Sequence, residues 1–208
     1  MSDSPPRTVA PRGQAIAGLL LATFASLAGS VSQAQPAEQP GQYVLEPQRS
    51  SVTFAVDAFS HSQIKMRFHR MNAQLEPAHG DLDSGRVTVT IDAASLETRP
   101  RFLSPIIRGG GMLDVARYPE IRFVSTRLVR TGEGNGWLLG DLTICGITRP
   151  VRLLVTPVGA DGNPWHDGTL AFSAAGEVSR REFGLSAWSP TVSDTVHMNI
   201  QVEFVHGP

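Results

Sequence analysis

Three arginines in one short stretch have the chemistry to bind an anionic group. Arg99, Arg101 and Arg108 flank or lie within residues 101–113, which are otherwise mostly apolar residues and glycines. Arginine suits phosphate because its planar guanidinium donates two parallel hydrogen bonds to phosphate oxygens. The stretch is therefore a candidate contact for the headgroup of an anionic ligand. The alternative is that all three arginines are solvated side chains on the surface.

The histidines and the single cysteine are the candidates for metal or nucleophile chemistry. His61 and His69 are eight residues apart, which places them on one face of a strand, and His79 follows. Two basic side chains lie between the first pair and no third ligand is evident, so we expect no metal site. Cys145 falls in an expected strand, where a lone thiol is typically a small buried residue.

Motifs for catalysis or for phosphate binding are missing from the sequence. It contains no G-x-S-x-G nucleophile elbow, no GxxxxGK loop and no GxGxxG fingerprint. A single cysteine also excludes an intramolecular disulfide framework and a cysteine-based metal centre. We therefore expect no catalytic residues.

The elements that position these residues follow from composition and pattern. The chain has 208 residues, of which 41% are apolar and 18% charged, and its formal net charge is −1. This is enough apolar material for the core of one domain, or at most two small ones. The near-zero charge argues against a nucleic-acid partner, which would favour a strong basic excess.

The first 34 residues have the order of a secretory signal peptide. Two arginines precede the uncharged apolar run 15–28, and Ser32 and Ala34 supply the small residues of a cleavage site. The run is short for a membrane-spanning helix, which needs about 20 residues. We expect a cleaved signal, with an uncleaved anchor as the alternative, and a Pro/Gln-rich linker over residues 35–42.

The rest of the chain is patterned as strands. Apolar residues alternate with polar or small ones, which indicates one buried and one solvated face. The alternating segments are 52–56, 87–91, 121–123, 142–144, 151–155 and 196–204. About eight antiparallel strands without a helical layer must close into a barrel or stack as a sandwich. Alternation alone does not decide between a packed core and a ligand cavity.

Two segments interrupt this pattern. Residues 92–97 favour a helical turn with Asp92 as its N-cap. Within residues 101–113, Ser104 followed by proline predicts a helix start and Gly109 a helix stop. The resulting short amphipathic helix is either a plug that closes a barrel end or a lid over a ligand mouth.

Five blocks of the sequence, in order, resemble the YceI-like family. They cover Tyr43 to Val205, and the resemblance implies an all-β domain over residues 43–206. The implied fold is an eight-stranded antiparallel extended lipocalin-like β-barrel with an apolar tunnel and short helical lid segments. The blocks are YVLEPQRSSVTFAVDAFSHS, VTIDAASLET, MLDVARYPEIRFVSTRLV, GDLTICGITRPVRLLV and SRREFGLSAWSPTVSDTVHMNIQVEF.

The same resemblance implies a binding function in the bacterial periplasm, in agreement with the signal. The expected ligand is a long-chain isoprenoid lipid, an isoprenoid quinone or a similar amphiphile, held for transport, storage or sequestration. It implies no enzyme activity and no cofactor, and it leaves room for transient contact with a membrane or a membrane protein. The chain departs from the family pattern over residues 103–111, where apolar residues and glycines replace a polar stretch.

Inward-facing apolar residues are expected to bind the ligand, although each is also explained as barrel wall. On the strands they are Phe54, Val56, Val89, Ile91, Phe123, Ile144, Leu153, Phe172, Met198, Ile200 and Val202. In the lid and a loop they are Phe102, Ile106, Ile107 and Trp188.

Two other functions remain open. One is an accessory of a quinone-dependent redox system, or an enzyme that uses the barrel as a substrate pocket. The other is a sandwich-type interaction domain with a packed core.

Overall fold

The computed structural model of the protein describes residues 43–59, 62–78, 81–132, 134–159, 165–166 and 169–207. The expected signal segment 1–34, the linker 35–42, and two of the histidines considered above, His61 and His79, lie outside these residues.

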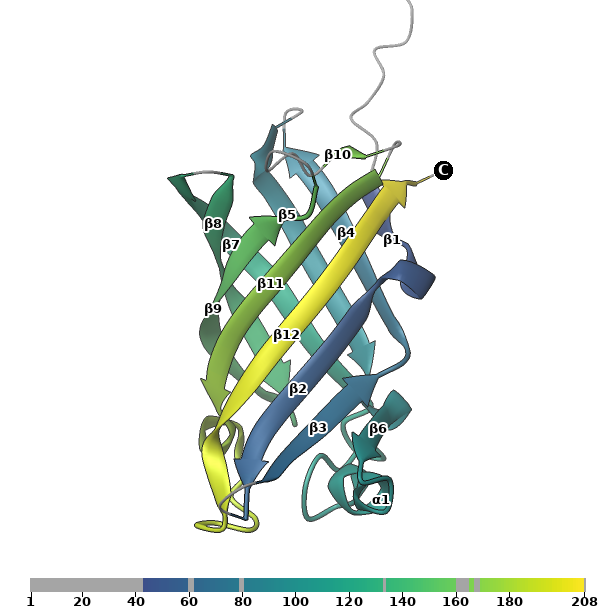
Figure 1. Cartoon of the computed structure of the whole chain (residues 1–208), viewed down its shortest axis with the longest axis vertical. Helices are drawn as coiled ribbons and strands as arrows, with labels where there is room; N and C mark the ends of the chain where they lie inside the picture. The colour runs from purple at the N-terminus through teal and green to yellow at the C-terminus, as the bar shows by residue number, and fades with distance from the viewer. Residues whose placement is uncertain are drawn as a thin grey trace, which may run out of the picture. The chain divides into compact units, whose positions relative to one another are not determined.

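The described chain forms one sheet of twelve strands and has one short α-helix (Figure 1). The strands are β1 (Tyr43–Leu45), β2 (Ser51–Ala58), β3 (Ser62–Phe68), β4 (Met71–Ala78), β5 (Asp81–Asp92), β6 (Leu96–Arg99), β7 (Glu120–Gly132), β8 (Asn135–Ile144), β9 (Ile147–Pro157), β10 (Trp165–His166), β11 (Thr169–Ser179) and β12 (Val192–His206). The helix is α1 (Leu103–Arg108).

The sheet closes on itself as an antiparallel barrel. Its strand order is β10-β11-β9-β8-β7-β5-β4-β1-β12-β2-β3-β6, and β11 also pairs with β12. That last pairing makes a ring of eight strands, from β11 through β9, β8, β7, β5, β4 and β1 to β12. β1 and β2 pair with successive parts of the same edge of β12, and β3 and β6 continue the sheet from β2. The predicted eight-stranded barrel is confirmed, and closure leaves no free edge in the ring.

Strand alternation decides which side chains enter the barrel. In β2, Val52, Phe54 and Val56 are all buried, with exposed fractions of 1%, 7% and 5%. Their partners across the β2–β12 ladder are Ile200, Met198 and Val196, and Met198 and Val196 are likewise buried. The period-two pattern in the sequence therefore corresponds to the inward face of neighbouring strands.

The two predicted interruptions are a 3-10 turn and the helix α1. Asp92 Oδ1 accepts a hydrogen bond from the Ala94 N–H at 2.8 Å, as expected of an N-cap. The helix ends at Gly109, as predicted. Ser104, however, does not cap it. This residue lies inside the helix, where its buried Oγ accepts a hydrogen bond from the Thr98 N–H at 2.9 Å and ties α1 to β6.

The end of the barrel near α1 is filled by side chains. The larger cluster of buried apolar residues includes Phe68 and Ile107 from this end, together with Phe183 from the 3-10 turn at Arg180–Phe183. The sequence predicts Cys145 in a strand, and this prediction is wrong. Cys145 lies in the turn between β8 and β9. It has a φ of 50° and is followed by Gly146 with a φ of 73°. Its thiol is half-buried and donates a hydrogen bond to the Leu113 carbonyl at 3.4 Å.

Candidate ligand-binding cavity

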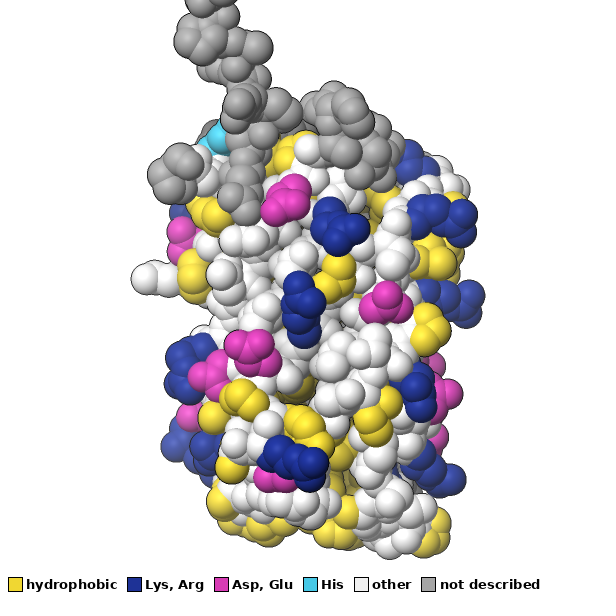
Figure 2. Space-filling model, turned by 180° about the vertical axis from the view of Figure 1, so that it is seen from behind, with side chains coloured by type: hydrophobic (Ala, Val, Ile, Leu, Met, Phe, Trp, Pro, Cys, Tyr) yellow, Lys and Arg dark blue, Asp and Glu magenta, His cyan; other side chains and the backbone are white. Residues whose placement is uncertain are grey.

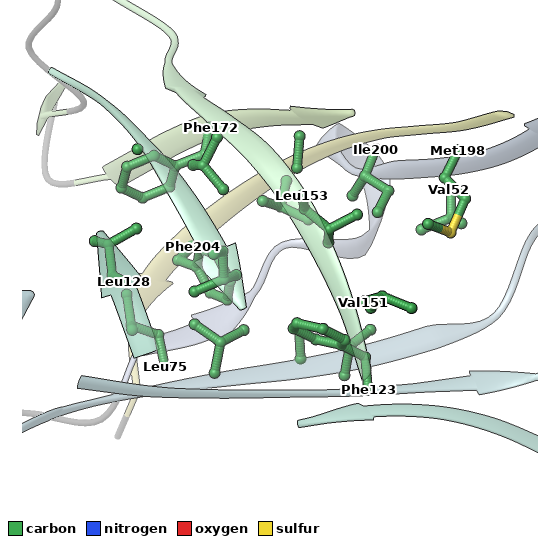
Figure 3. A pocket seen from close by; sticks show the side chains of 18 of the residues that line it. Val52, Leu75, Phe123, Leu128, Val151, Leu153, Phe172, Met198, Ile200 and Phe204 are labelled. Carbon is green, nitrogen blue, oxygen red and sulfur yellow. The ribbon is translucent and has the colours of Figure 1, made fainter. Parts of the chain in front are cut away.

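A cavity of about 500 Å³ lies inside the barrel, away from the packed end. Figure 3 shows side chains from several strands converging on it, with Phe172, Leu128 and Leu75 toward one end and Val52 and Met198 toward the other. The volume falls in the range of small-molecule sites, roughly 300–1,000 Å³. All of its lining residues are apolar or glycine except Arg130 and Asn135.

The polar residues mark a mouth at the hairpin that joins β7 to β8. Arg130 and Gly134 line the cavity and are also exposed, so the cavity reaches the surface there. Asn135 Oδ1 is buried and has no hydrogen-bond partner among the described residues. A buried amide oxygen without a partner carries a desolvation cost, which a hydrogen-bond donor on a ligand would offset.

A second cavity of about 70 Å³ lies among the side chains of the packed end. Its wall is apolar apart from Arg180, and α1 and the 183–192 segment contribute to it through Ile107, Phe183 and Trp188. The residues that line it are Phe54, Val56, Ile64, Met66, Phe68, Ile107, Met112, Leu113, Ile121, Ile144, Val178, Arg180, Phe183, Leu185, Trp188, Val192 and Val196.

Arg180 fixes the loop that closes this end. The guanidinium donates hydrogen bonds to the carbonyls of Ser193, Ala187 and Val192 at 2.8, 2.7 and 2.9 Å, and also to that of Leu185. The side chain is buried, and burial lowers the pKa of its guanidinium, an effect that the nearby Asp194 charge opposes. Arg180 is therefore a structural cation that satisfies backbone carbonyls.

Most of the predicted ligand-binding residues line one of the two cavities. Those on the large cavity are Phe54, Val89, Ile91, Phe123, Leu153, Phe172, Met198, Ile200 and Val202. Those on the small cavity are Val56, Ile107, Ile144 and Trp188, with Phe54 shared. Their contact with a ligand stays a prediction, but their position on a cavity wall is a feature of the fold.

Phe102 and Ile106 were expected at the ligand and lie elsewhere. Their exposed fractions are 68% and 48%, and they line neither cavity. Helix α1 buries the side that carries Ser104 and Ile107, so Phe102 and Ile106 on the other side face solvent. The helix therefore lies over the packed end and does not cover the mouth at the β7–β8 hairpin.

The three candidate headgroup arginines are also absent from both cavity walls. Arg99 and Arg101 are exposed. Arg108 is half-buried and donates hydrogen bonds to the carbonyls of Ser104 and Ala94 at 3.3 and 3.2 Å, which fastens the end of α1 to the preceding turn. The three arginines lie near the packed end of the barrel, because they are close in sequence to α1, which lies over that end.

Sequence reasoning missed the mouth residues for a local reason. Ser125 pairs with Gly140 and Arg127 with Leu139, so β7 contains one more residue than β8 between these pairs. Such a bulge reverses which residues point inward. Alternation from Phe123 would point odd-numbered residues into the barrel, whereas Leu128 and Arg130 line the cavity.

Few titratable groups meet the cavities. Arg130 lines the large cavity and Arg180 the small one, and no other Asp, Glu, His, Lys or Arg of the described residues does so. No cluster of three or more potential metal-ligating His, Cys, Asp or Glu side chains occurs in the described ranges. In the same part of the chain, no helix is long and apolar enough to cross a membrane.

The comparison with protein families identifies this barrel. The model of the YceI-like domain matches residues 43–204. The chain belongs to the YceI-like family. The cavity described above is therefore the interior of a YceI-like barrel.

Curated relatives match this YceI-like chain over nearly their full lengths. A UPF0312 protein of Pseudomonas savastanoi pv. phaseolicola is 30% identical over 194 residues, which cover 92% of this chain and 97% of the relative. A UPF0312 protein of Shewanella denitrificans is 26% identical over 182 residues, or 86% of this chain and 95% of the relative.

Solved structures share the YceI-like fold. Burkholderia cenocepacia BcnA aligns with a TM-score of 0.68 and 21% identity, covering 76% of this chain and 98% of BcnA. A polyisoprenoid binding domain from Saccharophagus degradans, implicated in plant cell wall breakdown, aligns with a TM-score of 0.57 and 15% identity. That alignment covers 79% of this chain and 98% of the domain.

Proposed function

We propose that this YceI-like protein binds the hydrocarbon chain of an isoprenoid lipid or isoprenoid quinone inside the barrel. The observation that carries the proposal is the cavity of about 500 Å³, whose wall is apolar except for Arg130 and Asn135 at its mouth. Each buried methylene contributes about 0.8 kcal/mol, so a long chain gains affinity without any catalytic group.

The two polar mouth residues give the ligand an orientation. Arg130 has N–H groups that donate hydrogen bonds. The buried Asn135 Oδ1 is an acceptor without a donor among the described residues. A polar headgroup is favoured at the β7–β8 hairpin, with the hydrocarbon chain running toward Val52 and Met198 (Figure 3). The name of the Saccharophagus degradans domain supports an isoprenoid as the chain, since that protein is described as binding polyisoprenoids.

Binding without catalysis is favoured over an enzyme or a redox accessory. Proton transfer or nucleophilic catalysis needs titratable groups within hydrogen-bond reach of the reacting atoms. Of the described residues on the large cavity, Arg130 alone is titratable, and an arginine stays protonated in proteins. We therefore propose a carrier or store, in which the barrel shields the chain from water.

The proposed setting is the periplasm. Its support is the order of charged, apolar and small residues in the first 34 positions, which is that of a cleaved export signal. A lipid with a long chain is insoluble in this aqueous compartment, so a carrier that encloses the chain has a physical role there.

The carrier would exchange its ligand with an anionic membrane through the outer face beside the mouth. Val129, Trp137 and Leu154 are neighbours in register across β7, β8 and β9, and Val129 and Leu154 are each 38% exposed. Exposed Arg127 and Arg152 lie in the next row, and the Arg152 guanidinium stacks 5.0 Å from the centre of the Trp137 ring. Figure 2 shows apolar side chains among Lys and Arg along the side of the barrel that carries β8 and β9. Apolar and basic groups together suit an anionic lipid surface.

Native mass spectrometry of the full chain, exported and purified from its own host without detergent, tests the proposal. We expect a fraction with added mass that solvent extraction releases as an isoprenoid. Protein without added mass that also fails to bind an isoprenoid quinone in titration would overturn it. A straight-chain lipid as the bound species would retain the carrier and overturn the isoprenoid assignment.

A further inference from the structure

One side chain, that of Phe54, borders both cavities in the barrel. The large cavity and the small cavity share Phe54 and no other lining residue. Phe54 follows Val52 on the inward face of β2 and pairs with Met198 of β12. Val52 and Met198 lie at one end of the large cavity in Figure 3. The Phe54 ring therefore stands where the large cavity ends and the small one begins.

This ring is held in place. Phe54 is 7% exposed, and its ring meets the edge of the Phe68 ring with centroids 5.3 Å apart and an interplanar angle of 69°. Phe68 is itself 2% exposed. Edge-to-face pairs of buried rings have a preferred geometry, and close packing around them leaves few other rotamers.

The space beyond the ring is suitable for more hydrocarbon. The small cavity of about 70 Å³ has an apolar wall except for Arg180, whose guanidinium donates to four backbone carbonyls. A chain that passed Phe54 would enter this space and would be stopped by the plug residues Ile107 and Phe183.

We propose that Phe54 is the end wall of the ligand cavity and sets the length of the chain that the barrel binds. The inference rests on the proposed function, because it needs a chain inside the large cavity. A chain longer than the distance from the mouth to Phe54 leaves its extra units in water, where they add no affinity. Each methylene-sized group that is buried adds about fourfold in affinity.

A length series tests this assignment. Isoprenoid alcohols that differ by one isoprene unit are titrated against wild type, Phe54→Ala and Phe54→Leu. For wild type we expect affinity to rise with length and then to level off. In the Phe54 variants the end wall is open, so we expect affinity to level off at a longer alcohol. The shortest alcohol that gains no further affinity in wild type should bind at least tenfold tighter to Phe54→Ala than to wild type.

The control removes the same ring from another part of the wall. Phe172 lines the large cavity on β11 and does not line the small one, so Phe172→Ala widens the cavity without joining the two. Its plateau is expected at the wild-type length. Phe54→Leu removes less volume and guards against loss of the fold in Phe54→Ala, with circular dichroism as the check on both.

The possible results distinguish failure of the end-wall proposal from failure of the proposed binding function. Equal plateaus for wild type and folded Phe54 variants overturn the end wall while leaving the carrier intact. An equal shift in Phe172→Ala also overturns it, because volume alone would then explain the effect. Failure of wild type to bind any alcohol of the series or any isoprenoid quinone overturns the proposed function and this inference with it.

Discussion

The ring of Phe123 lies directly on the backbone of Gly140 in the neighbouring strand. A Cβ on Gly140 would lie 2.5 Å from two ring carbons of Phe123 and 2.6 Å from the Val124 carbonyl oxygen. Phe123 lines the large cavity, so the missing side chain at Gly140 leaves room for a ring of the cavity wall. A glycine at this position is required by close approach, since no other residue leaves room for the ring.

Gly140→Ala is therefore expected to destabilise the barrel by about 2 kcal/mol, because the ring and a backbone oxygen must both move. Urea unfolding followed by tryptophan fluorescence measures the change. Gly111→Ala is the control, since a Cβ there has nothing within 4 Å, and its effect should stay within about 0.5 kcal/mol. Equal stabilities for the two variants would contradict the packing described for Phe123.

Replacing Arg180 by lysine tests the closed end of the barrel. A lysine carries the same charge but cannot reach the carbonyls of Leu185, Ala187, Val192 and Ser193 together, so buried carbonyls lose their partner. We expect a loss of about 2 kcal/mol or more in the free energy of unfolding.

The adjacent Arg181 is the matched control for this change. Its side chain is 56% exposed and forms an ion pair with Asp194 at 3.5 Å, which is worth little in solvent. Arg181→Lys should change stability by less than about 0.5 kcal/mol. An equal loss in both variants would contradict this role, because the carbonyl contacts of Arg180 would then stabilise the protein no more than the exposed ion pair of Arg181 does.

Acid should destabilise the protein through Asp194. The Ser179 hydroxyl donates to its carboxylate at 2.6 Å and, with the Arg181 N–H and the charges of Arg181 and Arg180, lowers the pKa of Asp194 below its ordinary value. A folded-state pKa below the unfolded one gives stability that is present above the ordinary aspartate pKa and is lost as pH falls through the lowered value.

Melting temperatures measured from pH 7 down to pH 3 test this dependence. Asp194→Asn should show a smaller decrease across the acid range than wild type, because it has no carboxylate to protonate there. Ser179→Ala keeps the carboxylate and removes the hydroxyl donor, and its decrease should lie between the two. Parallel curves for all three proteins would contradict a stabilising role for this carboxylate.

Contact with anionic lipid is tested at Leu154. Wild type should sediment with vesicles that contain phosphatidylglycerol, less so at high salt, and should not sediment with neutral phosphatidylcholine vesicles. Leu154→Glu places a negative charge in the exposed apolar row and should reduce sedimentation several-fold. Gln201→Glu adds the same charge at an exposed position on β12, and unchanged sedimentation is expected. Equal binding by both variants would place the contact elsewhere.

The strands were predictable from alternation alone, whereas the closed barrel, as opposed to a sandwich, was predicted from the resemblance to the YceI-like family. Strands such as β2 and β12 must bury one face, so every second residue along them is apolar. Phe54 and Met198 are two of these inward-facing residues, paired across the two strands. With few helical residues to cover the sheet, the strands had to cover one another, which a barrel and a sandwich both achieve. The short turn at Asp92 was equally local, because an N-cap needs only its own side chain and the next backbone groups.

The mouth of the cavity was not predictable from the same reasoning. The bulge between Ser125 and Arg127 reverses the inward face of β7 halfway along the strand, and it leaves no mark in the alternation that precedes it. The arginines around α1 were predicted either to contact a headgroup or to be solvated, and the structure places Arg99 and Arg101 on the surface, away from both cavities. Which end of the barrel is open depends on packing between distant segments, such as Ile107 against the strands.

The direct test of a chain inside the barrel compares two adjacent alanines on β11. Ala174 lines the large cavity and Ala175 is exposed on the opposite face of the strand. Titration with an isoprenoid quinone gives the affinities of wild type, Ala174→Trp and Ala175→Trp. The first variant places an indole inside the barrel and the second places it outside. We expect at least a tenfold loss of affinity for Ala174→Trp and wild-type affinity for Ala175→Trp. Equal affinity of all three folded proteins would contradict this expectation, because the chain would then bind outside the cavity.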